Sequence, residues 1–343
     1  MSHLTIDFRP GHVKLLQQED PPAGGLRVLV TGASGLLGRA VLREFEKRGC
    51  AATGTAYRRA GPRLLRCDLI DEDAVKALVS RCEPDAVVHC AAERRPDVVE
   101  RHPEAADDIN VRATGALARE AATTCSTAAA RLTAKTTSRI PSTRTDAASW
   151  KESDKRFDTA HVSSARARRS SCIDNARDSR RSGSAVLRVP VLFGEVESLS
   201  ESAVTSLWPE VLRAGENRAL DHCQQRFPTH TRDVAAVCWN ICHAAAQDRS
   251  IRGMFHYSGK EQMTKYEMAL AMAQVFNLPS DHLVPLTERP AAAAAPRPLD
   301  SRLDCSRLEV LGLGVEPRAF ASAVRDCLWP FAPDKRRRQT VFH

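Results

Sequence analysis

The 343-residue sequence lacks long apolar runs, spaced metal-binding motifs and a high aromatic content. No apolar stretch approaches the roughly 20 residues that a membrane-spanning helix needs, so we expect no membrane association. The eleven cysteines are odd in number and never spaced as CxxC, which favours reduced thiols over a disulfide framework. Cys238 and Cys242 lie one helical turn apart without a matching pair, and HExxH is absent. We therefore expect no metal site.

The N-terminus also lacks the basic-then-apolar pattern of a secretory signal. We expect a cytoplasmic protein, with an additional nuclear location left open. The net charge of +8 suggests nucleic-acid binding at first sight. However, residues 122–183 hold thirteen Lys or Arg and six Asp or Glu, while the remainder is close to neutral. Because no basic face extends over the rest of the chain, we expect no nucleic-acid partner.

A glycine-rich turn follows the first apolar run, LRVLV at residues 26–30, and precedes a helix-like pattern. Gly32, Gly35 and Gly38 have the spacing GxxGxxG. In a strand–turn–helix unit, the first glycine permits the tight turn, the second admits a pyrophosphate, and the third lets the helix pack on the strand. The sequence therefore predicts a dinucleotide-binding turn, and a glycine-rich turn without a ligand is the alternative.

The end of the second predicted strand, residues 51–57, indicates which dinucleotide the chain binds. An acidic residue at this place would accept the ribose 2′-hydroxyl of NAD. The sequence instead has Arg58 and Arg59, and guanidinium groups suit a 2′-phosphate. We therefore predict NADP rather than NAD, with two solvated arginines as the alternative. Asp68 and Leu69, after the third strand, are expected beside the adenine.

The alternation of strand and helix patterns continues through a fourth strand at residues 85–90, which predicts a parallel sheet. The expected fold is α/β, a Rossmann-type doubly wound parallel sheet with a smaller mixed C-terminal lobe. Ligands of such sheets lie beyond the carboxyl ends of the strands. Cys90 and Arg94, which follow the fourth strand, are therefore expected on the cofactor side.

The second half contains one further strand pattern at residues 189–193 and a helical pattern at 202–212. Pro209 is expected to kink or interrupt that helix. We expect four of its side chains in the core: Val204, Leu207, Trp208 and Leu212. Farther along, Asp233 is predicted to cap a helix.

Two polar residues of the second half are predicted to have structural rather than catalytic roles. Thr264, followed by Glu267, has the spacing of a capping box. His230 lies in a predicted loop without an evident acidic partner. We interpret His230 as a structural or cleft residue, with a catalytic base as the alternative.

Several stretches carry a more specific resemblance, namely RVLVTGASGLLGRAV, VHCAAERRPDVVE, LRVPVLFGEVE, QQRFPTHTRDVA, GMFHYSGKEQMTKYEMA and DKRRRQTVFH. They resemble the extended short-chain dehydrogenase/reductase superfamily and its dTDP-4-dehydrorhamnose-reductase branch. Within that branch they are most similar to the family of regulatory (beta) subunits of methionine adenosyltransferase. The resemblance implies an NADP-binding regulatory subunit that modulates S-adenosylmethionine synthesis. It further implies a hetero-oligomer with the catalytic subunit of methionine adenosyltransferase.

The resemblance assigns both sites by residue. The implied cofactor contacts are Gly32, Ser34, Gly35, Leu36, Leu37, Gly38, Tyr57, Arg58, Arg59, Asp68, Leu69, Cys90, Arg94 and Leu192. The implied partner contacts are Leu328, Trp329, Phe331, Arg336, Arg338, Gln339, Thr340, Val341, Phe342 and His343, residue types that are common in interface hot spots. The expected divisions are a mobile N-terminus (1–25), the NADP-binding Rossmann domain (26–200), the smaller lobe (201–327) and the partner-binding tail (328–343).

A reductase of this superfamily needs Tyr-x-x-x-Lys on one helix, because the tyrosine delivers a proton and the lysine lowers its pKa. None of Tyr57, Tyr257 and Tyr266, the three tyrosines of the sequence, has lysine four residues later. We therefore expect no catalytic residue and a protein that is not itself an enzyme. An NADPH-dependent sugar-nucleotide reductase is the alternative.

Residues 122–183, where the family carries that motif, are rich in Ser, Thr and Arg and poor in apolar residues. Such a composition does not bury enough apolar area to offset the entropy of ordering. We expect this segment to be disordered and to supply no fifth strand, which leaves the neighbouring strands with unpaired edges. A shifted reading frame or misassigned exon is one explanation, and a lineage-specific insert is the other.

Overall fold

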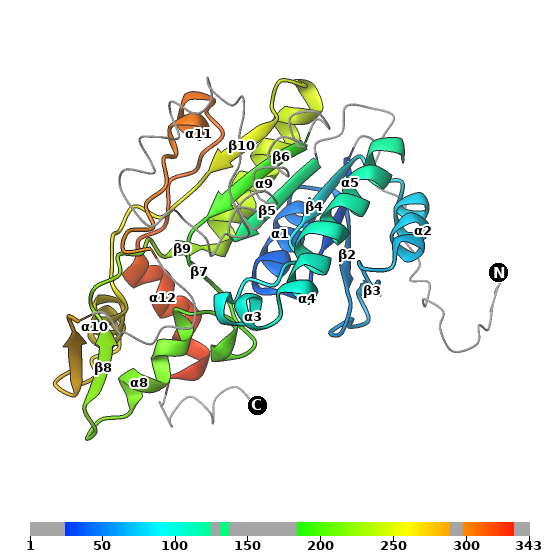
Figure 1. Cartoon of the computed structure of the whole chain (residues 1–343). Helices are drawn as coiled ribbons and strands as arrows, with labels where there is room; N and C mark the ends of the chain where they lie inside the picture. Colours follow the sequence, from blue (N-terminus) through cyan, green and yellow to red (C-terminus); the bar gives the residue numbers. More distant parts are fainter. Residues whose placement is uncertain (1–24, 125–130, 137–183, 289–297, 333–343) are drawn as a thin grey trace, which may run out of the picture.

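The computed structural model describes residues 25–124, 131–136, 184–288 and 298–332, which pack as two groups of elements (Figure 1). The larger group contains a seven-stranded parallel sheet with the order β10-β6-β5-β4-β1-β2-β3. Its strands are β1 (Arg27–Thr31), β2 (Ala51–Ala56), β3 (Leu64–Arg66), β4 (Ala86–His89), β5 (Arg131–Thr136), β6 (Ser184–Val189) and β10 (Gly253–His256). The strand order reverses between β1 and β4, which is where such sheets bind ligands.

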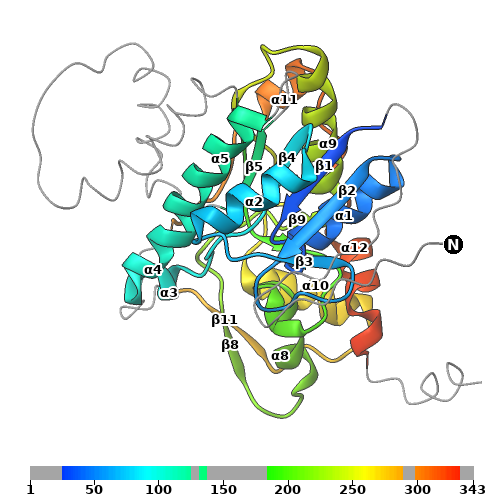
Figure 2. The same cartoon turned by 90° about the vertical axis from the view of Figure 1, so that its right-hand side faces the viewer.

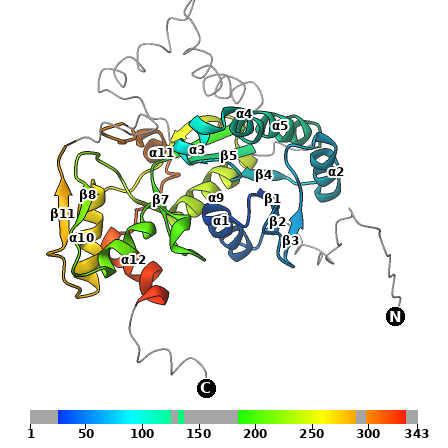
Figure 3. The same cartoon turned by 60° about the horizontal axis from the view of Figure 1, so that its bottom comes forward.

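Helices cover both faces of this sheet because its central strands are apolar on both sides. In β1, Val28 and Val30 belong to the core shared with α1 (Leu36–Lys47) and α9 (Thr231–Gln247). Leu29 faces the opposite core, which contains α2 (Glu72–Cys82) and α5 (Ala113–Thr124). Figure 3 shows α1 and α9 on one side of the strands and α5 on the other. This arrangement confirms the predicted doubly wound fold.

Shorter helical segments connect these elements. Between β4 and α5 the chain forms α3 (Pro96–Arg101), α4 (Pro103–Asp107) and a π-helical turn (Asp108–Arg112). A short helix near β10, α11 (Ser306–Val310), adds Leu308 to the core of α1 and α9. None of the described helices combines the length and the apolar character that a bilayer-spanning segment requires.

The smaller group has its own apolar core around the fully buried Trp208, Met268 and Phe320. Two short parallel strand pairs flank it, and Figure 2 shows the β8–β11 pair with α8 at the end opposite α11. The elements are β7 (Leu192–Phe193), α8 (Trp208–Leu212), β8 (Arg218–Asp221), β9 (Thr229–His230), α10 (Lys265–Val275), β11 (Leu283–Leu286) and α12 (Phe320–Leu328). Single 3₁₀ turns cover Leu199–Glu201, Thr205–Leu207 and Trp329–Phe331. The predicted smaller lobe is therefore present, while its boundaries stay predictions.

The prediction that residues 122–183 supply no strand was wrong for residues 131–136. There β5 pairs in parallel with β4 on one side and with β6 on the other. Main-chain hydrogen bonds do not depend on side-chain polarity, and two flanking strands offer unpaired groups on both sides. The composition argument considered side chains alone and so missed this strand. Residues 125–130 and 137–183 lie outside the described residues.

The strand predicted at residues 189–193 is divided in two. The sheet strand β6 ends at Val189, and β7 begins at Leu192 and pairs with β9 instead. Pro190 separates the two strands because proline has no N–H to donate to a ladder. The helix predicted at 202–212 is not continuous either: a 3₁₀ turn precedes α8, and Pro209 lies in the first turn of α8 rather than interrupting it. Leu212, predicted in the core, is 38% exposed at the end of α8.

The two capping predictions had different outcomes. His230, rather than Asp233, is the N-cap of α9, and its Nδ1 accepts a hydrogen bond from the N–H of Arg232 at 3.2 Å. Asp233 lies inside the first turn, where its carboxylate accepts from the N–H of Arg318 at 2.9 Å. The capping box of Thr264 before α10 is confirmed with both of its hydrogen bonds.

Candidate functional site

The glycine turn between β1 and α1 has the geometry that its spacing predicts. Gly32 has a φ of +68°, and a Cβ there would lie 2.7 Å from the backbone nitrogen of Ala91. A Cβ on Gly38 would overlap the carbonyl oxygen of Gly32. Gly35 donates its N–H to that same oxygen at 2.9 Å and is the N-cap of α1. The two outer glycines are thus required by close backbone approach.

The N-terminus of α1 carries no cap of its own. Gly35 has no side chain to cap it, and the first turn contains no acidic residue. The side chains of Leu36 and Leu37 are buried in the core, so only their backbone groups are available to a ligand. Unsatisfied N–H groups and the helix dipole favour an anion at such an end. This turn therefore fits the pyrophosphate of a dinucleotide.

Three arginines meet at Glu201 beside this turn, two at its carboxylate and one at its backbone oxygen. Glu201 receives a hydrogen bond from Arg39 of α1 and another from Arg59 after β2, each at 2.6 Å. Arg94, after β4, donates to the backbone oxygen of Glu201. Burial alone would raise the pKa of Glu201, but the hydrogen bonds from Arg39 and Arg59 hold that pKa at about 2. Glu201 is therefore ionised at neutral pH.

Of the predicted cofactor residues, the structure brings Arg59 and Arg94 together through Glu201. Tyr57 and Arg58 are exposed at the end of β2, and the guanidinium of Arg66 lies 5.9 Å from the centre of the Tyr57 ring. An exposed aromatic ring at this position offers a stacking surface for a base.

The predicted adenine contacts follow β3, and the remaining cofactor residues lie after β4 and in β7. Asp68 is half-buried and its carboxylate accepts from the N–H of Ile70 at 3.0 Å, while Leu69 is buried. Leu192 is buried in β7, and Cys90 is half-buried at the end of β4. Burial raises the pKa of the Cys90 thiol to about 12, so this thiol stays protonated and unreactive near neutral pH.

A buried polar chain links the end of β1 to the helices after β4. The hydroxyl of Thr114 donates to the backbone oxygen of Asn110, so it accepts from Nε2 of His89 at 3.0 Å. His89 Nδ1 then accepts from the hydroxyl of Thr31 at 2.6 Å. The side-chain oxygen of Asn110 accepts from the N–H of Glu93, and the side-chain amide of Asn110 donates to the backbone oxygen of Glu93. This network fixes the chain as it leaves β4, beside the glycine turn.

Arg39, Glu201 and Glu197, which also accepts a hydrogen bond from Arg59 at 3.2 Å, were not found from the sequence. Arg39 follows Gly38 directly, which places it on the turn-facing start of α1. Glu197 and Glu201 lie in an acidic run, EVESLSE, more than 130 residues from Arg59. No local periodicity connects these segments, because their contact depends on the packing of the smaller group against α1.

His230 is buried and makes structural contacts. Its Nε2 lies 3.6 Å from Sγ of Cys327, and its ring meets Phe193 edge-on. Burial, aided by the nearby Arg318, lowers the pKa of His230 to about 4, although Asp326 opposes this shift. A neutral imidazole that caps α9 matches the structural interpretation.

The predicted partner-binding tail is described only as far as residue 332. Leu328 is fully buried in the core of the smaller group, and Trp329 is 47% exposed. The carbonyl oxygen of Phe331 accepts from Nε1 of Trp208 at 3.2 Å. The other predicted contacts lie outside the described residues: Arg336, Arg338, Gln339, Thr340, Val341, Phe342 and His343.

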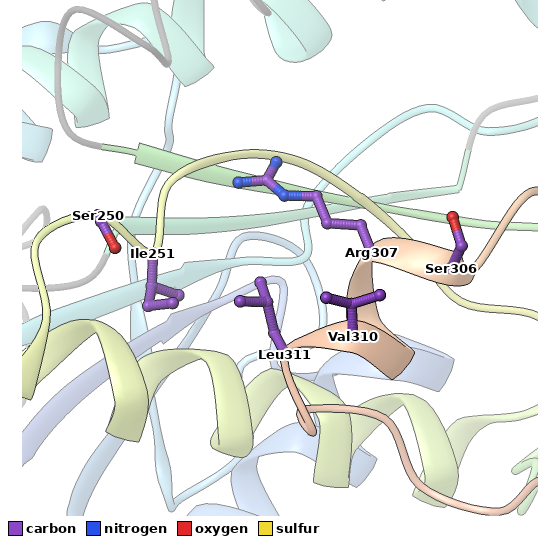
Figure 4. A pocket seen from close by; sticks show the side chains of 6 residues that line it. All are labelled: Ser250, Ile251, Ser306, Arg307, Val310 and Leu311. Carbon is purple, nitrogen blue, oxygen red and sulfur yellow. The ribbon is translucent and has the colours of Figure 1, made fainter.

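A pocket of about 300 Å³ lies elsewhere, between α11 and the segment before β10. Its lining residues are Ser250, Ile251, Ser306, Arg307, Val310 and Leu311. Figure 4 shows the Arg307 guanidinium directed away from the apolar side chains of Val310 and Leu311. That guanidinium donates to the backbone oxygens of Met254 and Arg252, each at 2.6 Å. The pocket is thus separate from the glycine turn.

Comparisons with known proteins identify the family of this chain. The family model described as the RmlD substrate binding domain matches residues 26–332. Methionine adenosyltransferase 2 subunit beta of Danio rerio is 51% identical over 319 residues, which cover 92% of this chain and 94% of that protein. The same subunit of Bos taurus is 45% identical over 340 residues, which cover 99% and 98%.

Solved structures share the fold at low sequence identity. A dTDP-4-dehydrorhamnose reductase of Bacillus anthracis in complex with NADP has a TM-score of 0.69 at 17% identity, covering 90% of this chain and 99% of that chain. UDP-glucose 4-epimerase of Thermotoga maritima with UDP-glucose has a TM-score of 0.69 at 18% identity, covering 92% and 99%. The family model and the near full-length identities confirm the resemblance seen in the sequence. The chain belongs to the RmlD-like family of Rossmann-type short-chain dehydrogenases/reductases and, within it, to the methionine adenosyltransferase 2 beta subunits.

Proposed function

We propose that the chain is a non-catalytic regulatory subunit that binds NADP and a methionine adenosyltransferase catalytic subunit, and thereby modulates S-adenosylmethionine synthesis in the cytoplasm. The observation that carries the proposal is the 51% identity over 92% of the chain with a protein named as a beta subunit. Residues of the site support the cofactor part, because the glycine turn offers backbone N–H groups that suit a pyrophosphate, and Arg58 and Arg59 follow β2 and carry groups that suit a ribose phosphate.

The same residues indicate what bound NADP would do here. The backbone at Leu36 and Leu37 would hold the pyrophosphate, and the arginines after β2 would hold the 2′-phosphate. Bound NADP would supply a hydride-accepting nicotinamide. Proton transfer to or from a substrate would need a tyrosine, but Tyr257 donates its hydroxyl to the Val315 oxygen and burial raises its pKa. We infer that the cofactor orders the chain rather than reacts.

Pull-down and calorimetry test the two parts separately. The full chain is expected to co-purify with the catalytic subunit and to bind NADP more tightly than NAD. A chain that ends at Ala332 keeps Leu328 and Phe331 in their packing positions, so it is expected to bind NADP normally and to lose the catalytic subunit. Co-purification of the shortened chain at full yield would refute the role of the tail.

A sugar-nucleotide reductase is the second candidate, because the matching family model is named for the RmlD substrate binding domain. This function requires NADPH oxidation in the presence of dTDP-4-dehydrorhamnose. A turnover indistinguishable from the buffer control, with the chain folded and NADPH bound, would exclude it.

A further inference from the structure

The segment from Glu195 to Glu201, here termed the acidic loop, is attached to the rest of the chain by ion pairs. Glu195 pairs with Arg43 of α1 and with Arg232 of α9. Glu197 lies 3.6 Å from Arg39 and 3.2 Å from Arg59. Glu201 lies 2.6 Å from each of the same two arginines. All three carboxylates of this loop are thus directed at the elements that form the dinucleotide turn.

Glu201 differs from the other two glutamates in its burial. Its side chain is 12% exposed, against 45% for Glu195 and 62% for Glu197. It also accepts the backbone N–H of Glu197 at 3.0 Å, which closes the loop on itself. Exposed ion pairs contribute little, while charge-assisted bonds to a shielded carboxylate contribute more. Glu201 is therefore the principal contact of the acidic loop with Arg59.

Arg59 is also the residue that the proposed function assigns to the ribose 2′-phosphate. A guanidinium binds a carboxylate and a phosphate with the same donors, so both anions compete for it. We propose that Glu201 is an internal competitor of the 2′-phosphate, and that it sets the preference of this site between phosphorylated and unphosphorylated dinucleotides. This inference rests on the proposed binding of a dinucleotide.

Competition between Glu201 and the 2′-phosphate lowers the affinity for NADP but not that for NAD. NAD carries no group at the 2′-position that needs Arg59, so its binding leaves the contact of Glu201 intact. NADP must take donors from Glu201, and the cost of that exchange lowers its apparent affinity. The far end of the loop stays fixed, because the buried Ser202 donates to the Leu192 oxygen at 2.7 Å and accepts from the N–H of Val204 at 3.0 Å. The exchange is thereby confined to the loop.

Calorimetry with two fragments, 2′,5′-ADP and 5′-ADP, measures the contribution of the 2′-phosphate directly. The substitution Glu201→Gln is expected to raise the affinity for 2′,5′-ADP and NADP about threefold to tenfold and to leave 5′-ADP and NAD unchanged. Glu195→Gln is the matched control, because Glu195 lies on the same loop but pairs with Arg43 and Arg232 instead of Arg59. Glu197→Gln, at an exposed position, is expected to shift affinity in the same direction but less.

The outcomes separate the inference from the function on which it rests. If the wild-type chain prefers NADP and the ratio of the 2′,5′-ADP and 5′-ADP affinities is the same in Glu201→Gln as in Glu195→Gln and the wild type, the competitor role is wrong while the cofactor site stands. If Glu201→Gln raised the affinity for 5′-ADP as much as that for 2′,5′-ADP, the competitor role would be wrong as well. The substitution would then affect the whole site rather than the 2′-phosphate. If neither fragment nor either dinucleotide binds to the folded wild-type chain, the proposed cofactor and the inference fall together. A thermal melt of each variant confirms that it is folded.

Discussion

At the scale of single residues, the glycine turn is the most constrained part of the site. A Cβ on Gly38 would overlap the Gly32 oxygen, so Gly38→Ala must push α1 away from β1. Overpacking of this kind costs about 1–3 kcal/mol, and it also moves the amides that face the ligand. We predict a lower melting temperature and at least a tenfold weaker NADP affinity, measured by thermal melting and calorimetry.

Gly61→Ala is the control for that substitution. No heavy atom lies within 4 Å of a Cβ at Gly61, and its backbone does not require glycine. This variant is expected to match the wild type in both measurements. If Gly38→Ala bound NADP with wild-type affinity, the turn would not be the pyrophosphate site.

His230 gives the second prediction at this scale, a dependence of stability on pH. Its pKa is about 4 in the folded chain against an ordinary value of 6.5, so between these values the unfolded chain binds more protons. Stability is therefore full above pH 6.5 and falls as the pH decreases toward 4, by roughly 3 kcal/mol from this group. Denaturant titrations at a series of pH values measure the slope.

The variant His230→Asn isolates this effect, because the asparagine oxygen can replace Nδ1 as the cap of α9 but does not titrate. Its stability curve is expected to be flatter than that of the wild type between pH 6.5 and 4. Two parallel curves would show that the pH dependence originates elsewhere.

At the scale of elements, the capping box at the start of α10 is a local device with a defined energetic role. The Thr264 hydroxyl accepts from the N–H of Glu267 at 3.2 Å, lies 2.9 Å from Nδ1 of His222, and is fully buried. Removing it leaves buried groups without a partner, so Thr264→Ala is expected to lower the free energy of unfolding by about 1–2 kcal/mol. Thr264→Ser keeps the hydroxyl, and chemical denaturation should place it between the wild type and the alanine variant. Equal losses in both variants would contradict a role of the hydroxyl.

Elements were predictable from the sequence where their cause is local. The glycine turn and the Thr264 capping box depend on residues a few positions apart, so spacing alone revealed them. The strand β5 was missed because its place depends on β4 and β6, whose unpaired groups become adjacent only in the folded sheet. Asp233 was taken for a cap because its partner, Arg318, lies 85 residues away.

The same limit applies to the candidate site. The sequence predicted the turn and Arg59, each next to a strand end. It did not reveal that Glu201, 142 residues from Arg59 in the chain, binds the same guanidinium. Such a contact follows from how the two groups of elements pack, and no pattern in either segment encodes it. Sequence patterns here indicated the groups that we propose to bind a dinucleotide, but not Glu201, the group that we propose to compete with it.

At the scale of the whole molecule, the chain passes repeatedly between its two cores. After β8 it returns to the large sheet with α9 and β10, goes back with α10 and β11, and returns again with α11 before α12 completes the smaller core. Asp233 of α9 and Arg318, just before α12, join the cores by a charge-assisted hydrogen bond. Neither core is a continuous segment, so we expect neither to unfold alone.

The last prediction follows from this connectivity. A ligand that binds only the folded chain adds about 2.7 kcal/mol at a concentration 100 times its Kd. NADP is therefore expected to raise the melting temperature by several degrees and to move a single calorimetric transition as one unit. The smaller core should gain the same increase in melting temperature although it lies away from the glycine turn. The reason is that the acidic loop and α9 connect it to that turn. Two transitions, of which NADP shifts only one, would show that the cores are independent and that the cofactor stabilises the large sheet alone.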